Sequence, residues 1–460
     1  MSDNAEAAAA LTELLVIAGM DAVPAALRGA DPVFPTPYKA GTAGAAALAA
    51  VGTAASRLWS LKTDRIQNVR VDVRAAAAAM RSARYLKIDG KAPTEVWDPL
   101  SGYYPVKNGR WVSIHCNFRN HRDAAMGVLG NPADRAAAEK ASGGWDGLAL
   151  EDAIHAAKGC AGLARTAEEW ARHPHSAAVA AQPLLEIQRI GDSKAEPLPD
   201  GKRPLSGVRV LDLTRVLAGP TCARTLAEHG ADVLKIAGPH LPDSGTSEFD
   251  TGIGKLQAFL DLRTKEGTET LRGLLKTGDV FSQSFRPGTL AARGFSPEEA
   301  AKLRPGIVYV TLSAWGTEGP WRDRRGFDSI VQTVSGMAYA QGGEKPRLLP
   351  VSVIDYVSGY LMAFGAMTAL ARRATEGGSW LVRVSLARTG KWIVDRGFID
   401  GFASVPSELA ADELKSLLMQ TQNYTHLRPV LELSETPPFW ERPPAPLGSH
   451  PPAWPPRDRH

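Results

Sequence analysis

The sequence predicts an α/β protein with a large, mainly parallel sheet and a smaller α+β domain. From about residue 205 to 345, short β-branched runs alternate with segments of helix length, whereas residues 90 to 190 are interrupted by Pro and Gly. Such alternation is typical of parallel strands with helices on both faces. A chain of 460 residues also exceeds the usual size of one hydrophobic core. The expected architecture is a Rossmann-like open parallel sheet with a second domain.

The elements of the large domain follow one another in order across residues 205–402. Strands are expected at 208–213 (VRVLDL), 232–236 (DVLKI), 258–262 (AFLDL), 279–284 (DVFSQS) and 307–313 (IVYVTLS), and helices near 218–229, 265–276 and 297–303. Each strand is a short, largely apolar run, as expected for strands buried on both faces.

The rest of the chain divides into four parts. Residues 1–89 are a helical segment with a β run, 90–194 the small α+β domain, 195–204 (AEPLPDGKRP) a linker, and 403–460 a tail whose end is rich in Pro. Within 1–89, a small-residue helix with Gly52 leads into a β run at 69–73. The segment 313 positions later repeats this pattern with Gly365 and a β run at 382–386. A true internal repeat or a shared Ala-rich composition explains the likeness.

Composition narrows the class of ligand. The net charge is +4 without a block of like charges, which disfavours nucleic acid and suits an anionic ligand. Cys116, Cys160 and Cys222 have neither disulfide-framework nor metal-ligand spacing, so we expect no metal and a reducing cytoplasm. The N-terminus lacks the pattern of a signal peptide, and no apolar run reaches the ~18 residues of a membrane span. A soluble protein without membrane contact is expected.

A strand gives way to a helix at Gly219 and Pro220. The N-terminus of a helix presents backbone N–H groups to an anion such as a pyrophosphate. Neither a GxGxxG nor a Walker sequence stands at this turn, so a dinucleotide dehydrogenase or a P-loop NTPase is disfavoured. An ordinary tight turn is the alternative interpretation.

Several motifs occur in a specific order over residues 204–390. They are VRVLDLTRVLAGP, GADVLKI, the pair Gly254–Lys255, FRPGTL, VYVTLSAWGTEGP and GFDSIVQTVSGM. Together they resemble family III CoA-transferases, which include formyl-CoA and carnitine CoA-transferases and α-methylacyl-CoA racemase. Residues 104–175 resemble the small domain of that family and SETPPFWERPPAPLG its tail, but here the small-domain part comes first. The resemblance implies acyl-CoA and a small carboxylic acid as partners and an interlocked homodimer.

The resemblance places the nucleophile at Asp328, in GFDSIVQ. A carboxylate can attack a thioester to give an anhydride and then an aspartyl thioester, from which CoA passes to the acceptor acid. Without the resemblance, an Asp at a helix start is more often an N-cap. Gly342 and Gly343 match the family's glycine loop and are predicted to stabilise the oxyanion, with a plain surface turn as the alternative.

The resemblance also assigns the residues that contact CoA. They are Leu217, Ala218, Lys255, Ser284, Phe285, Arg286, Ala314 and Trp315. Arg provides forked donors for phosphate and Phe a face for adenine. At Leu217, Gly238, Leu256 and Ser284 the sequence departs from residues common in relatives, which leaves two other functions open. These are a 2-methylacyl-CoA racemase, for which His115 or His121 would have to supply the missing acid/base group, and a CoA-binding protein without turnover.

Overall fold

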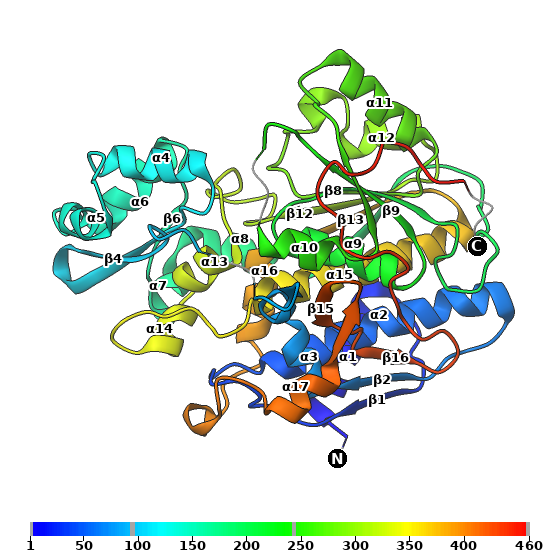
Figure 1. Cartoon of the computed structure of the whole chain (residues 1–460), viewed down its shortest axis with the longest axis horizontal. Helices are drawn as coiled ribbons and strands as arrows, with labels where there is room; N and C mark the ends of the chain where they lie inside the picture. The colour runs from blue at the N-terminus through cyan, green and yellow to red at the C-terminus, as the bar shows by residue number, and fades with distance from the viewer. Residues whose placement is uncertain (1–2, 93–96, 242–244, 457–460) are drawn as a thin grey trace.

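The computed structural model describes residues 3–92, 97–241 and 245–456, and its main feature is a seven-stranded sheet (Figure 1). The strands lie in the order β10-β9-β8-β11-β12-β13-β7. Their bounds are β7 Glu186–Gly191, β8 Arg209–Leu213, β9 Asp232–Ala237, β10 Lys255–Phe259, β11 Val280–Gln283, β12 Val308–Ser313 and β13 Ser379–Ser385. All pairs are parallel except β13 with β7. The prediction of an α/β protein with a large parallel sheet is therefore confirmed.

Counted along the chain from β8, the six parallel strands lie in the order 3-2-1-4-5-6. The direction of strand order reverses between β8 and β11. In open parallel sheets, ligands bind outside the carboxyl ends of the strands at such a reversal. The topology alone thus indicates where a site should lie.

Helices cover both faces of this sheet. They are α9 Ala218–Glu228, α10 Thr246–Gly252, α11 Lys265–Lys276, α12 Pro297–Leu303, α15 Val353–Glu376 and α16 Leu386–Val394. Two further helices, α13 Asp328–Val334 and α14 Met337–Gly342, lie off the sheet, where α13 packs against the strand 161–163 of the small domain and α14 packs against α13. The three helices expected in the large domain are found within a residue of their predicted bounds. Local chemistry fixes their ends: Ser296 and Glu299, for example, form a capping box at the start of α12.

Residues 3–89 form a separate layer below the sheet (Figure 1). It contains α1 Ala5–Ala18, β1 Ala25–Arg28, α2 Ala40–Thr63, β2 Val69–Asp72, α3 Val73–Ala79, the 3-10 turn η1 Ser82–Tyr85 and β3 Lys87–Ile88. β1 pairs in parallel with β2, and β16 Leu431–Leu433 from the tail pairs antiparallel on its other side. Helix α2 packs along α15, so this layer shares one hydrophobic core with the large domain.

The small domain has its own core and lies beside the large sheet (Figure 1). Its sheet is β4 Gly102–Val106, β5 Arg110–Ile114 and β6 Ala161–Leu163, with helices α4 Arg119–Val128, α5 Arg135–Ser142, α6 Gly147–Ala156, α7 Ala167–Arg172 and α8 Pro174–Ala181 and the turn η2 Lys107–Gly109. The predicted small-domain range ends at 194, but β7 within it is the edge strand of the large sheet.

The tail is more regular than its Pro content suggests. The tail forms α17 Ala411–Leu417, β14 Leu418–Thr421 and β15 Tyr424–Leu427. Two 3-10 turns precede it, η3 Ala291–Arg293 within the large domain and η4 Phe402–Ser404 at its end. β14 and β15 make a hairpin that continues onto β3. The Pro-dense part agrees with the prediction, since residues 434–456 contain no helix or strand.

Helix α15 is the one described helix long and apolar enough, by length and composition, to cross a membrane. The sequence predicts no apolar run of this length. Of its most apolar window, 94% is buried inside the fold. Its apolarity is therefore explained by packing against α2, α9 and β13.

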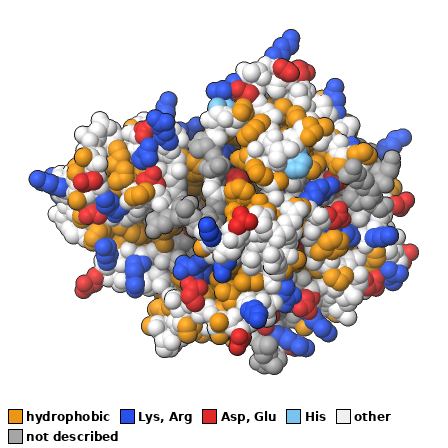
Figure 2. Space-filling model, in the orientation of Figure 1, with side chains coloured by type: hydrophobic (Ala, Val, Ile, Leu, Met, Phe, Trp, Pro, Cys, Tyr) orange, Lys and Arg blue, Asp and Glu red, His pale blue; other side chains and the backbone are white. Residues whose placement is uncertain are grey.

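On the visible surface, acidic and basic side chains are interspersed (Figure 2).

Candidate active site

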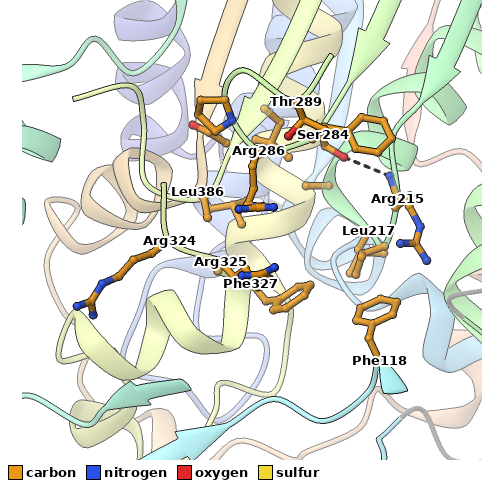
Figure 3. Close-up of a pocket in the computed structure, with 18 of the residues that line it drawn as sticks. Phe118, Arg215, Leu217, Ser284, Arg286, Thr289, Arg324, Arg325, Phe327 and Leu386 are labelled. Atoms are coloured by element: carbon orange, nitrogen blue, oxygen red, sulfur yellow. Dashed lines mark hydrogen bonds between the residues drawn. The ribbon is translucent and has the colours of Figure 1, made fainter. Parts of the chain in front are cut away.

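A cavity of about 360 Å³ opens at the carboxyl ends of β8, β11 and β12, at the reversal of strand order (Figure 3). Three segments of the large sheet line it, and α15, α16 and the small domain close it. The lining residues are Phe118, Asn120, His121, Leu213, Arg215, Val216, Leu217, Ala218, Leu241, Ser284, Phe285, Arg286, Pro287, Thr289, Leu312, Ser313, Ala314, Arg322, Arg324, Arg325, Gly326, Phe327, Asp355 and Leu386.

The turn between β8 and α9 forms one wall. Val216 has φ 73°, which is rare for a β-branched residue because its side chain crowds the backbone there. Gly219 lies so close to Thr214 that a Cβ atom would stand 2.3 Å from the Thr214 Cβ. This tight turn brings Leu217 and Ala218, at the start of α9, onto the cavity. The helix N-terminus therefore faces the ligand space, as an anion site requires.

Positive charge dominates the lining. Arg215, Arg286, Arg322, Arg324 and Arg325 border the cavity, against Asp355 as the single described carboxylate. Within the described chain, no carboxylate lies in salt-bridge range of Arg286 or Arg325, whereas Arg324 pairs with Asp152. Burial and the nearby Arg286 guanidinium lower the pKa of Arg325. Two guanidinium groups that repel each other in one cavity provide forked donors for an anionic ligand.

The small domain contributes an aromatic and histidine wall. His115 stacks on Phe327 with ring centroids 3.9 Å apart, and Phe118 and His121 flank this pair. Burial, with a smaller contribution from cavity arginines, lowers the pKa of His121 to about 4. Its buried Nδ1 has no hydrogen-bond partner in the described structure. His121 is thus a neutral imidazole at the cavity, supplied by a domain that precedes the sheet in sequence.

Two buried carboxyl groups meet at the start of α15. Oδ2 of Asp328 accepts a hydrogen bond of 3.0 Å from the backbone N–H of Asp355, and Oδ1 accepts one from the Gln332 amide. Burial raises the pKa of Asp328 to about 6. It also raises that of Asp355 well above its usual range, with repulsion from Asp328 adding to the effect. The pair therefore holds a proton more readily than two exposed carboxylates would.

The two carboxyl groups differ in position. Asp355 lines the cavity, and Asp328 is not among the described lining residues. Both oxygens of Asp328 accept hydrogen bonds from the protein. The predicted nucleophile at Asp328 stays a prediction, and the cavity lining adds Asp355 as a second candidate for contact with a ligand. The sequence signal for Asp355 was a lone acid in the first turn of a long apolar helix.

The structure brings most, but not all, of the predicted CoA contacts to the cavity. Leu217, Ala218, Ser284, Phe285, Arg286 and Ala314 line it, and Ser284 accepts a hydrogen bond of 3.2 Å from the backbone N–H of Arg215 (Figure 3). Lys255 does not, because its ammonium is buried 2.8 Å from the Asp212 carboxylate. Trp315 is turned into the protein, where its indole N–H donates to the Arg325 carbonyl.

The predicted oxyanion loop also lies away from the cavity. Gly342 ends α14, and Gly343 caps that helix with φ 72°. The neighbouring Gln341 donates to the carbonyl of Pro35 in the N-terminal layer. Arg325 and Phe118 also line the cavity and were not predicted, whereas His121 was named as a group that a racemase would need there. Only the packing of the small domain against the sheet, which no local pattern encodes, brings Phe118 and His121 to the cavity.

The sequence is similar to those of CoA-transferases. The profile of CoA-transferase family III matches residues 15–195 and 205–425, on either side of the predicted linker. The chain is 36% identical over 201 residues to acetyl-coenzyme A transferase nodX of Hypoxylon pulicicidum, a match that covers 42% of this chain and 34% of that protein. It is 35% identical over 202 residues to succinate–glutarate CoA-transferase of Agrobacterium fabrum, covering 39% and 50%.

The probable fatty acyl-CoA transferase Rv3272 of Mycobacterium tuberculosis is 30% identical over 205 residues. Its crystal structure aligns with 42% of this chain and 58% of that chain, with a TM-score of 0.39. The chain thus spans about a third to a half of the length of the first curated relatives it matches. Because the family profile matches both parts of the chain on either side of the linker, this chain belongs to CoA-transferase family III.

Proposed function

We propose that the chain moves CoA from an acyl-CoA thioester to a carboxylic acid, and that Asp355 carries the covalent intermediate. The observation that supports this most directly is the position of Asp355: the one described carboxylate lining an arginine-rich cavity at the reversal of strand order. Names of relatives that include succinyl-CoA and acetyl-CoA transferases support the class of reaction. The identity of the acyl group is left open.

The steps balance as follows. An ionised oxygen of Asp355 attacks the thioester carbonyl, the C–S bond breaks, and a mixed anhydride and CoA thiolate form. The thiolate attacks the aspartyl carbonyl and releases the donor acid, leaving an aspartyl-CoA thioester. The acceptor carboxylate then attacks this thioester to form a second anhydride, and the thiolate takes the acceptor acyl group and regenerates Asp355.

The surroundings suit each step. In the proposal, the start of α9 and the guanidinium groups of Arg286 and Arg325 hold the phosphates of CoA. Asp328 fixes the backbone at Asp355 and is a positioning residue. Phe118 and Phe327 keep water from the anhydride, which hydrolysis would otherwise destroy. The Rossmann-like classification, a homodimer and a cytoplasmic location remain predictions.

Trapping the intermediate tests the proposal. The protein is incubated with a panel of acyl-CoAs, treated with hydroxylamine or borohydride, and analysed by peptide mass spectrometry. We expect modification at Asp355, lost in Asp355→Asn and retained in Asp328→Asn. Modification at Asp328 instead would restore the prediction made from the sequence, and CoA binding without any adduct would favour a protein without turnover.

One observation favours a second function. His121 and Asp355 line the same cavity, and racemisation of a 2-methylacyl-CoA needs two acid/base groups around the α-carbon. Incubation of 2-methylacyl-CoA with the protein in D₂O separates the two functions. Deuterium at the α-carbon that is lost in His121→Ala supports racemisation, whereas its absence together with CoA exchange supports transfer.

A further inference from the structure

The N-terminal layer repeats the unit that carries Asp355. α2 and α15 each have 24 residues, and each end of α2 lies 313 positions before the matching end of α15. The same offset relates the last residues of β2 and β13, Asp72 and Ser385, and the first residues of α3 and α16, Val73 and Leu386. β1 precedes α2 and pairs in parallel with β2, as β12 precedes α15 and pairs in parallel with β13.

The internal packing of the two units also matches. A Cβ atom on Gly52 of α2 would stand 2.7 Å from Cγ1 of Val69, and one on Gly365 of α15 would stand 2.5 Å from Cγ1 of Val382. Both glycines and both valines are related by the offset of 313. Close helix-on-strand contact therefore requires Gly at the same place in each unit. A shared Ala-rich composition alone does not explain a contact of this kind, so the repeat suspected from the sequence is structural.

The helix starts share a capping carboxylate. In the large domain, Asp328 accepts from the backbone N–H of Asp355 at 3.0 Å. In the N-terminal unit, Asp31 accepts from the backbone N–H groups of Gly41 at 3.0 Å and Thr42 at 2.7 Å. Thr42 lies 313 positions before Asp355. Asp31 therefore performs for α2 the task that Asp328 performs for α15, although the two Asp residues do not share the offset.

The two units differ in what stands beside the cap. Thr42 replaces the carboxylate of Asp355. The hollow at the start of α2 is lined by Asp3, Asn4, Ala5, Glu6, Gly29, Ala30, Asp31, Lys39, Thr42 and Ile399, with Lys39 as its one described cation. The Lys39 ammonium is 2.7 Å from Glu6. This hollow thus has Thr42 at the position of Asp355, and its one described cation is already paired with a carboxylate.

We propose that residues 25–79 are a non-catalytic copy of the unit at 308–394, so that each chain holds one working site, built from its own residues, and one non-catalytic counterpart. α2 of the copy covers α15, and the small domain of the same chain supplies Phe118 and His121 to the cavity. In this arrangement the site requires no second subunit. That the site is catalytic rests on the proposed function. The number of CoA sites per chain and the number of subunits that each site needs do not.

The first test counts sites without turnover. Native mass spectrometry of the full chain is recorded over a range of protein concentrations with added CoA. We expect one CoA per chain, bound by the monomer. Two CoA molecules per chain, or binding confined to a dimer, would overturn the proposal. If no acyl-CoA is turned over, the proposed function fails while this measurement still decides the number of sites.

A matched pair of variants then compares the two caps. Asp31→Ala and Asp328→Ala remove the same kind of contact at the start of α2 and of α15, and both should lower the Tm. Only Asp328→Ala removes the charge that opposes ionisation of Asp355, so the acidic limb of the pH profile of CoA transfer should move down by about one pH unit. An equal shift in Asp31→Ala would contradict the proposal that residues 25–79 are non-catalytic, because that cap would then act on the reaction.

Discussion

The units at the starts of α2 and α15 share one scaffold and differ in one functional group. Both have a parallel strand pair, a 24-residue helix and a carboxylate that caps its first N–H groups. Only the unit of α15 adds a second buried carboxylate, Asp355, beside five arginines. The comparison separates what the fold needs from what a reaction needs. A capping Asp is structural in both units, whereas the second carboxylate raises the cost of burial and is present only at the cavity.

Asp355→Asn provides the largest expected effect in this comparison. The amide cannot form an anhydride, so CoA transfer should fall by at least about 10³-fold. Asp31→Asn, at the start of α2, should leave kcat within about twofold. The rates are measured by exchange of labelled CoA between two acyl groups. Similar losses in the two variants would mean that the units are not functionally distinct.

The binding of acyl-CoA should depend on an arginine at the cavity and not on the cation at the start of α2. Arg325→Ala should raise the KM for acyl-CoA by about 10- to 100-fold, since a charge-assisted hydrogen bond contributes ~1.5–3 kcal/mol. Lys39→Ala removes the one described cation in the hollow at α2 and should leave KM unchanged. An unchanged KM in both variants would exclude Arg325 from the phosphate or acyl contacts.

Thr42→Asp tests whether a second carboxylate is tolerated in the copy. The new carboxyl group would be buried beside Asp31 without arginines nearby, and we expect a loss of about 2 kcal/mol in the free energy of unfolding at pH 8. At pH 4, where the group is protonated, the loss should be smaller. Chemical denaturation at the two pH values measures the difference. No adduct should form at residue 42.

The smallest expected effect is a gain in stability. Burial and repulsion raise the pKa values of Asp328 and Asp355 in the folded protein. A carboxyl group with a raised folded pKa binds more protons when folded, so its penalty is absent below about pH 3 and complete above its folded pKa. Asp355→Asn should therefore raise the Tm by on the order of 2 °C at pH 8 and leave it unchanged near pH 3. A lower Tm at pH 8 would contradict the shift.

Local patterns predicted the elements well and the site only in part. The strands and helices of the large sheet were readable because apolar runs and capping residues such as Ser296 act within a few positions. The cavity positions of Arg286 and Ser284 were predicted from motif order. Lys255 does not line the cavity, because the Gly254–Lys255 pair does not reveal that Asp212 on β8, on the far side of β9, forms an ion pair with the ammonium in the interior. The sequence indicated Asp328 alone, because no local pattern shows that Asp355 lines the cavity.

The pairing of β2 with β16 has a consequence for how the chain folds. β2, at Val69–Asp72, precedes its antiparallel neighbour Leu431–Leu433 by more than 350 residues. The helix that covers α2 is also in the second half of the chain. Contacts between segments this far apart in the chain close slowly, so the layer around α2 should be among the last parts of the fold to complete its packing, and its apolar helix should stay exposed until then.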